Sequence, residues 1–242
     1  MKNLITKVIV ALCMMLGSSF TLSMQKAQNP EQATKELHKL LADPSVRHNR
    51  NLNTPGLLEK INQLIAQGAD VNSVESSGRT PLMRASFNLG NLEIVRALIE
   101  AGADVNRQNA QGDTALHQLL KSDFSHALQK GRILIDAGAD VNRKNNNGIT
   151  PLISAAFPGV VNVFKLLVDA GADINAQTIN GTTALMALVQ GGVNPAGIAL
   201  LLELGADQNI TNNDGKTALD IARDKRYQPN VDALSVVSQK LE

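Results

Sequence analysis

The chain has 242 residues, of which 43% are hydrophobic and 19% charged, and this balance allows a packed core and excludes a wholly disordered protein. Its formal net charge of +1 gives no long-range attraction to nucleic acid, and its single cysteine, Cys13, excludes an intrachain disulfide or a cysteine-based zinc site. Aromatic residues make up only 2% of the chain, so small and medium aliphatic residues must build the core, which suits thin layers of closely packed helices.

Residues 1–23 have the layout of a secretory signal peptide. Two lysines lie before the apolar run 8–16, and small and polar residues follow it at 17–23. This order predicts export with cleavage after Ser23, or alternatively after Ser19. An uncleaved membrane anchor is the other interpretation, but the run is about half as long as the ~20 apolar residues that a spanning helix needs.

Residues 24–51 are expected to form a helical lead-in and part of an N-terminal cap. Leucines recur on one side of a helical pattern over 31–41. The polar segment 43–55 is expected to be a loop, and the apolar positions of 57–65 indicate a second helix. Because the end of a stack meets water on one face, we interpret 30–67 as a divergent terminal unit.

From residue 52 to residue 242 the chain is organised as an internal repeat. Successive copies of two phrases begin 33 to 36 residues apart and stay in phase over five units. Such a period indicates stacked repeats rather than a single globular core. The phrase Gly-Ala-Asp-x-Asn begins at Gly68, Gly102, Gly138, Gly171 and Gly205, and the phrase Thr-(Pro or Ala)-Leu begins at Thr80, Thr114, Thr150, Thr183 and Thr217.

Each unit is predicted to contain a turn followed by two helices. Thr80 and Pro81 suit the cap and the first position of a helix, and Ala85 lies on its apolar face. Residues 94–99 carry the apolar stripe of a second helix, and Gly102 follows where a left-handed helix exit favours a residue without a side chain. One unit has too little apolar surface to fold alone, so copies must stack to bury a continuous core.

These units resemble the ankyrin repeat over residues 52–227. The resemblance implies an all-α fold, an ankyrin-repeat solenoid of stacked helix-turn-helix units joined by β-turn loops, with about four internal repeats and divergent terminal caps. The last cap is expected to end in a helix over 231–241. The longest spacing contains 121–126, which we place between the two helices of that unit. The family's histidine after the threonine phrase is kept only at His117.

The sequence shows no catalytic constellation, so we expect neither an enzyme nor a bound cofactor or metal. A nucleophile elbow, a phosphate-binding loop and a dinucleotide fingerprint are all missing. His117 is expected to hydrogen-bond to backbone in the turns. The recurring aspartates are expected to make local bonds to backbone at helix exits, because stacking spreads them into a row instead of gathering them around a cation. They are Asp70, Asp104, Asp140, Asp173 and Asp207.

The resemblance implies that a protein partner binds the concave face, which turn tips and the outer sides of first helices form. We expect this face to be basic at the tips and apolar behind them, suited to a partner with an acidic rim. The other interpretation is that its Phe and Met residues are core between layers. The candidate partner-binding residues are Arg79, Met83, Phe87, Arg107, His117, Arg143, Lys144, Ile153, Phe157 and Met186.

The function expected from these features is that of an exported protein-binding module, monomeric and free of a membrane anchor once the signal peptide is removed. The short signal sequence looks bacterial, which places the protein in the periplasm or outside the cell. Two alternatives remain open: a secreted effector that binds a host protein, and a regulatory or protective partner of a periplasmic enzyme.

Overall fold

The computed structural model describes residues 29–43, 55–88, 92–121 and 126–238. The expected signal peptide, its cleavage sites and the anchor alternative lie outside these residues, as do most of the expected loop at 43–55 and of the insertion at 121–126. Within the described residues, no helix combines the length and apolar character needed to cross a membrane.

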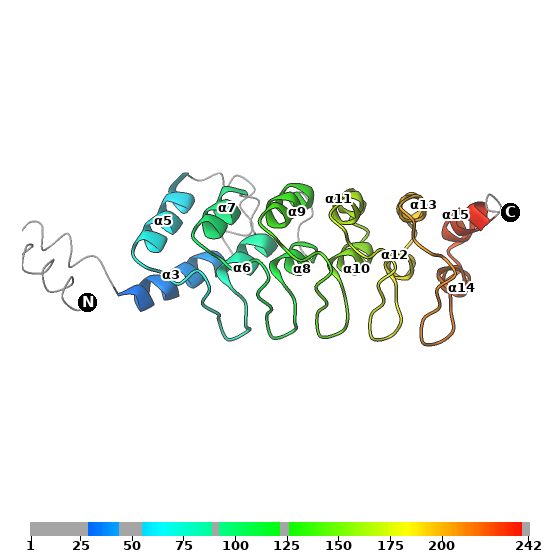
Figure 1. Cartoon of the computed structure of the whole chain (residues 1–242), viewed down its shortest axis with the longest axis horizontal. Coiled ribbons are helices and arrows are strands. Elements are labelled where there is room, and N and C mark those ends of the chain that lie inside the picture. Colours follow the sequence, from blue (N-terminus) through cyan, green and yellow to red (C-terminus); the bar gives the residue numbers. More distant parts are fainter. Residues whose placement is uncertain (1–28, 44–54, 89–91, 122–125, 239–242) are drawn as a thin grey trace, which may run out of the picture.

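The described residues fold into helix pairs that stack in a single direction, with two rows of helices and a row of loops along one edge (Figure 1). The first helices of the pairs form the row next to the loops. They are α3 (Pro30–Ala42), α6 (Pro81–Asn88), α8 (Ala115–Leu119), α10 (Pro151–Ala156), α12 (Ala184–Gly191) and α14 (Ala218–Asp224).

The second helices form the outer row in Figure 1, and within the described residues the fold contains helices and turns but no strand. The all-α prediction is therefore confirmed, and the last cap ends in a helix as expected. The second helices are α5 (Pro55–Ala66), α7 (Leu92–Glu100), α9 (Ala127–Asp136), α11 (Phe164–Asp169), which follows the 3-10 turn η2 (Val161–Val163), α13 (Pro195–Glu203) and α15 (Gln228–Ser238).

The threonine phrase starts the first helices, as predicted. The Thr150 hydroxyl accepts a hydrogen bond from the backbone N–H of Ile153, and Pro151 occupies the first turn of α10. Thr183 caps α12 in the same way by accepting from Met186 N–H. These bonds satisfy backbone donors that the first turn of a helix leaves without a partner, which explains why the phrase recurs in every unit.

The glycine of the Gly-Ala-Asp phrase ends the second helices. Gly102 has φ +88°, a left-handed conformation that residues with a side chain rarely adopt. Its N–H donates to the carbonyl of Ile99, and the N–H of Ala103 donates to the carbonyl of Leu98. This double closure satisfies the last carbonyls of α7 and turns the chain toward the loop.

A continuous apolar core runs through the stack between the two rows. The first helices pack closely because their facing positions carry small residues such as Ala85, Ala155 and Ala156, all fully buried. Leucines of the threonine phrase fill the remaining space, and Phe164 is the largest fully buried side chain of the described residues. Since each unit shares its core with its neighbours, stability is a property of the stack rather than of a single unit.

The N-terminal pair, α3 with α5, closes one end of the stack as the sequence predicted for a divergent unit. Leu37 and Leu41 of α3 are buried in the shared core. The hydroxyl of Thr34 accepts a hydrogen bond of 2.8 Å from Asp70 N–H, and Nε2 of His38 lies 2.8 Å from Oγ of Ser73. Polar side chains of α3 thus bind the first turn of the repeated part.

Candidate functional site

The four loops that follow α7, α9, α11 and α13 are each held closed by one polar side chain at the base. In the loop 107–113, the Asn109 N–H donates to the carbonyl of Asp113, and the Asn109 carboxamide oxygen accepts from the N–H groups of Gln111 and Asp113. Asn145, Thr178 and Asn212 do the same in the three following loops. The loop tips are therefore fixed in advance of any binding.

Neighbouring loops are also bonded to each other. Asn146 N–H donates to the carbonyl of Gln111 at 3.0 Å, and Ile179 N–H donates to the carbonyl of Asn147 at 3.1 Å. The Asn146 carboxamide adds a second bond, to the carbonyl of Ala110 at 3.0 Å. The row of loops together with the exposed parts of the first helices, called the loop face below, is one continuous surface.

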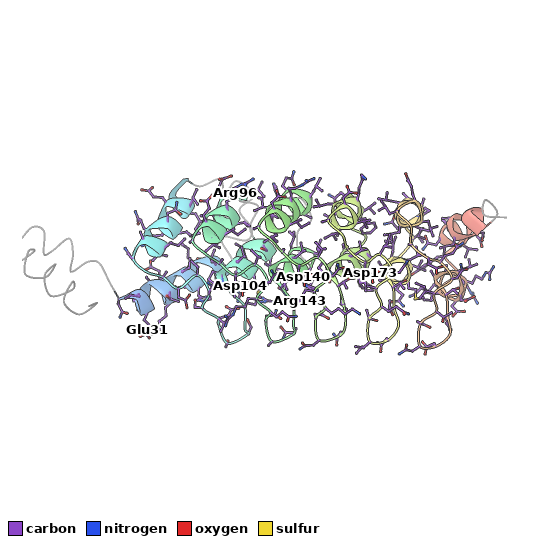
Figure 2. The ribbon with its side chains drawn as sticks, viewed as in Figure 1. Glu31, Arg96, Asp104, Asp140, Arg143 and Asp173 are labelled. Atoms are coloured by element: carbon purple, nitrogen blue, oxygen red, sulfur yellow. The ribbon has the colours of Figure 1, made fainter. Side chains whose placement is uncertain are left out.

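The aspartates of the Gly-Ala-Asp phrase make the local hydrogen bonds to backbone that the sequence predicted. The Asp104 carboxylate accepts from Asn106 N–H at 2.9 Å, and the Asn106 carboxamide bonds twice to the next unit. It accepts from Asp140 N–H at 2.7 Å and donates to the carbonyl of Gly138 at 2.9 Å. The same side chains recur along the stack, where Figure 2 shows Asp104, Asp140 and Asp173 in succession. The described residues contain no group of three or more potential ligands able to hold a metal ion.

His117 lies in the core of the stack rather than on the loop face. Its Nδ1 lies 2.9 Å from the Thr114 hydroxyl, and its Nε2 donates to the carbonyl of Ile149, in the next unit, at 2.9 Å. Burial lowers the pKa of the ring, and the hydrogen bond to Ile149 opposes this only in part. The ring accepts from Thr114 N–H at Nδ1 and donates at Nε2, which is the pattern of a neutral imidazole, and the predicted bond to backbone in the turns is confirmed.

The structure separates the candidate binding residues into surface and core. Arg107, Arg143, Lys144 and Phe157 are exposed, and Arg79 and Phe87 are partly buried against each other. Four candidates remain, of which Ile153 is 4% exposed and is described with the cavity below. The expectation that a partner contacts the other three side chains directly is wrong, because their position on the short first helices points into the neighbouring unit and leaves them at most 1% exposed. These residues are Met83, His117 and Met186.

Two side-chain positions face each other across the loop face in several units: the residue before the threonine and the residue seven places after it. In the first full unit the guanidinium of Arg79 lies over the ring of Phe87, 5.4 Å from its centroid. In the last unit the Lys216 ammonium lies 2.6 Å from a carboxylate oxygen of Asp224. The sequence reasoning missed this pairing, although comparing the two positions across the units would have shown complementary residues.

The unit that begins with α8 places a buried carboxylate at this pair of positions. Asp113 is almost fully buried and accepts hydrogen bonds from Gln118 at 2.9 Å, Lys121 at 2.6 Å and Asn145 at 2.8 Å. Burial alone would raise the pKa of Asp113, but the bonds from Asn145 and Lys121 outweigh it and hold the pKa below its usual range. This network joins two neighbouring loops.

A cavity of about 620 Å³ opens on the loop face between the unit that begins with α10 and the unit that begins with α12. Its polar lining includes the backbone and side chains of both loops, and Ser154 of α10. Of the predicted binding residues only Ile153 and Phe157 lie here, and Ile153 is a buried wall residue. The apolar lining is formed by Leu120, Ile149, Ile153, Phe157, Pro158, Ile179 and Ala187.

Comparison with known proteins fits this architecture. A family model described as ankyrin repeats in three copies matches residues 48–109, 88–178 and 161–239. The crystal structure of the ankyrin repeat protein EF0377 superposes with a TM-score of 0.66 at 32% sequence identity, covering 74% of this chain and 91% of that one. No curated protein matches the sequence. With the repeated phrases, the paired helices and the bonded loops, these matches establish that the chain belongs to the ankyrin-repeat family, whose repeats are protein–protein interaction modules.

Proposed function

We propose that this protein is an exported protein-binding module that captures its partner on the loop face. The observation that carries the proposal is the bonding between neighbouring loops, such as Ile179 N–H to the Asn147 carbonyl, which makes one rigid surface from several units. A surface that is already ordered loses little conformational entropy when it binds. The fold alone does not choose the partner, so its identity must come from the side chains on this face.

The charge of the loop tips favours a partner with an acidic rim. Arg107, Arg143 and Lys144 are exposed at successive tips. The Lys144 ammonium donates to the carbonyl of Gln177 at 3.1 Å, and Arg143 lies 3.5 Å from a carboxylate oxygen of Asp140. Exposed pairs of this kind are weak, so these cations stay able to attract acidic groups of a partner and to accelerate its association.

Export is supported by the sequence of residues 1–23, with its basic head, apolar run and small polar end. The test is the N-terminal mass of the protein recovered from its native cells. A mature chain that starts at residue 24 or 20 in the periplasm or the medium is expected. An intact N-terminus on protein recovered from the cytoplasm would contradict export and leave the binding proposal unchanged.

The binding surface is tested by photo-crosslinking in native cells. A benzophenone amino acid placed at Arg107 or Lys144 reports on the loop face, and the same group at Glu100 or Arg132, both exposed on second helices, is the matched control. One dominant protein adduct is expected from the loop-face positions alone. Equal adducts from both rows, or none from any position, would contradict the proposal. None of these four residues lines the cavity, so the result is independent of the inference that follows.

A further inference from the structure

Ile179 departs from the pattern of the neighbouring loops. The corresponding positions four residues before the threonine carry Asn146 and Asn213, whose carboxamides donate to a carbonyl of the preceding loop at 3.0 and 3.1 Å. An isoleucine side chain cannot make this bond, and Ile179 is instead 63% exposed to solvent. The exchange gives up a hydrogen bond between loops and presents apolar surface to water. Local departures of this kind are expected where a residue serves binding rather than folding.

Phe157 departs from the pattern of the first helices in the same region. In the first full unit Arg79 covers the ring of Phe87, whereas the residue facing Phe157 is Ile149 and the ring is 60% exposed. The next unit carries Thr182 and Gln190 at the two facing positions. All four residues of these two units line the cavity. The cavity therefore lies where the Arg–Phe contact and the ion pairs of the other units are replaced by uncharged side chains.

The lining of the cavity carries a single charged side chain, and that one is already paired. Lys121 is the one charged residue among the described residues that line it, and its ammonium lies 2.6 Å from Asp113. Ser154, which is 8% exposed, has a hydroxyl with no hydrogen-bond partner among the described residues. The carboxamides of Asn147 and Asn180 are exposed on the two loops that border the opening. A cationic ligand would lose its hydration here without finding a counter-charge, and an anionic ligand would find only an ammonium that Asp113 already binds, so the site selects against both.

We propose that this cavity, the Phe157–Ile179 pocket, binds one bulky uncharged side chain, leucine, methionine or phenylalanine, from an extended segment of the protein partner. Phe157 and Ile179 enclose the side chain, and Asn147 and Asn180 bond to the peptide groups on either side of it. A carboxamide both donates and accepts, which matches the alternating N–H and C=O groups of an extended peptide. The volume of about 620 Å³ is larger than a single side chain fills and leaves room for the peptide groups on either side of it. The inference rests on the proposed binding function and adds the chemistry of the residue that is bound.

The probe for the test is a library of random twelve-residue linear peptides, selected against the full chain. Two variants remove the pocket with residues that the stack already uses at the same positions: Ile179→Asn, as at Asn146, and Phe157→Gln, as at Gln190. Leu128→Gln removes an exposed apolar side chain from the second helix α9 and is the matched control. All three sites are exposed, and an unchanged thermal unfolding midpoint verifies that each variant is folded.

We expect the selected peptides to share one bulky apolar residue without a charge at that place. We also expect the Kd to rise at least tenfold in each pocket variant and to stay within twofold in Leu128→Gln. Peptides whose Kd is unchanged by Ile179→Asn and Phe157→Gln would overturn the inference, and so would a shared charged anchor or a failure to select any peptide. Pocket-dependent binding of toluene without any selected peptide would assign the pocket to a small apolar molecule and would equally overturn it. If a crosslink from Arg107 or Lys144 is still found, the proposed binding function stands even when the pocket inference fails.

Discussion

The carboxylate of Asp113 lies 2.6 Å from the ammonium of Lys121, at the two positions that Ile149 and Phe157 occupy one unit later. The two units thus share one backbone arrangement and use it differently. In the first, a buried acid joins neighbouring loops. In the second, the same pair of positions forms part of an open apolar pocket.

Replacing Asp113 with asparagine is expected to lower the free energy of unfolding by about 2 kcal/mol, because an amide group would face donors that now bind a carboxylate. Lys121→Ala is the control and should cost no more than about 1 kcal/mol, since its side chain is 42% exposed and Asp113 keeps its bonds from Gln118 and Asn145. Urea denaturation measures both. Equal losses would show that the ion pair, and not the buried network, matters.

His117→Met is expected to lower the free energy of unfolding by about 1–2 kcal/mol, because the carbonyl of Ile149 loses its buried donor while the volume of the site stays filled. Methionine is the natural residue at this position in the units of Met83 and Met186. His117→Ala adds a cavity and should cost about 3 kcal/mol. If the two variants unfold at the same urea concentration, the hydrogen bond and not the packing carries the contribution.

Asn142→Ala is expected to lower the free energy of unfolding by about 1–2 kcal/mol. The Asn142 carboxamide donates to the carbonyl of Gly171 and accepts from Asp173 N–H, both at 2.8 Å. Asn209 occupies the same place in the last copy of the phrase, and within the described residues its carboxamide makes no bond to a further unit. Asn209→Ala should therefore change stability by less than about 0.5 kcal/mol. A comparable loss in the two variants would rule out the bonds between units as the cause.

Gly191→Ala is expected to destabilise the protein by about 2–3 kcal/mol, because an added Cβ would overlap the backbone carbonyl oxygen of Phe157 and push α10 and α12 apart. Gly102→Ala separates this overlap from the general effect of removing a glycine. At Gly102 a Cβ meets open space, and only its φ of +88° opposes the substitution, at about 1 kcal/mol. Thermal unfolding of both variants checks the order, and a less stable Gly102→Ala would contradict the tight contact.

The free energy of unfolding is expected to decrease in two stages as the pH is lowered. Burial lowers the pKa of His38 and of His117, so the folded state binds fewer protons than the unfolded state, and stability decreases as pH falls below the ordinary histidine value of about 6.5. Above that value the contribution is constant.

The second stage begins near the ordinary carboxyl values of about 4. For Glu75 and Asp113, burial alone would raise the pKa, but hydrogen bonds from Arg84 and Ser77 and from Asn145 and Lys121 hold it low. Their stabilisation is therefore lost as pH falls through the lowered pKa values. Unfolding free energies measured in urea between pH 8 and pH 3 trace both stages. The first should shrink in His117→Met, and an unchanged first stage would exclude His117 as its source.

Much of the fold followed from the sequence because the repeated residues satisfy local backbone groups. Thr150 caps a helix and Gly102 ends one whatever lies around them, so the phrases located the helices correctly. Which side of a short first helix faces the next unit is not a local property, and this is why the sequence leaves open whether Met83 and Met186 face a partner or the core. The pocket depends on residues of three successive units that meet only in the stack, so no single phrase could have predicted it.

The bonds of Asn106 and Asn142 reach two groups that the next copy of the Gly-Ala-Asp phrase offers: a glycine carbonyl and an aspartate N–H. A duplicated unit inserted between two others would find both groups. The chain can therefore lengthen or shorten by whole units and keep the hydrogen bonds between successive units. Specificity does not share this tolerance. A unit spliced between Phe157 and Ile179 would separate the two walls of the pocket, whereas one spliced after Asn209 would leave them together. Changes of length in this protein are therefore expected to preserve the pocket where a unit is added outside residues 120–190 and to disrupt it where a unit is added within them.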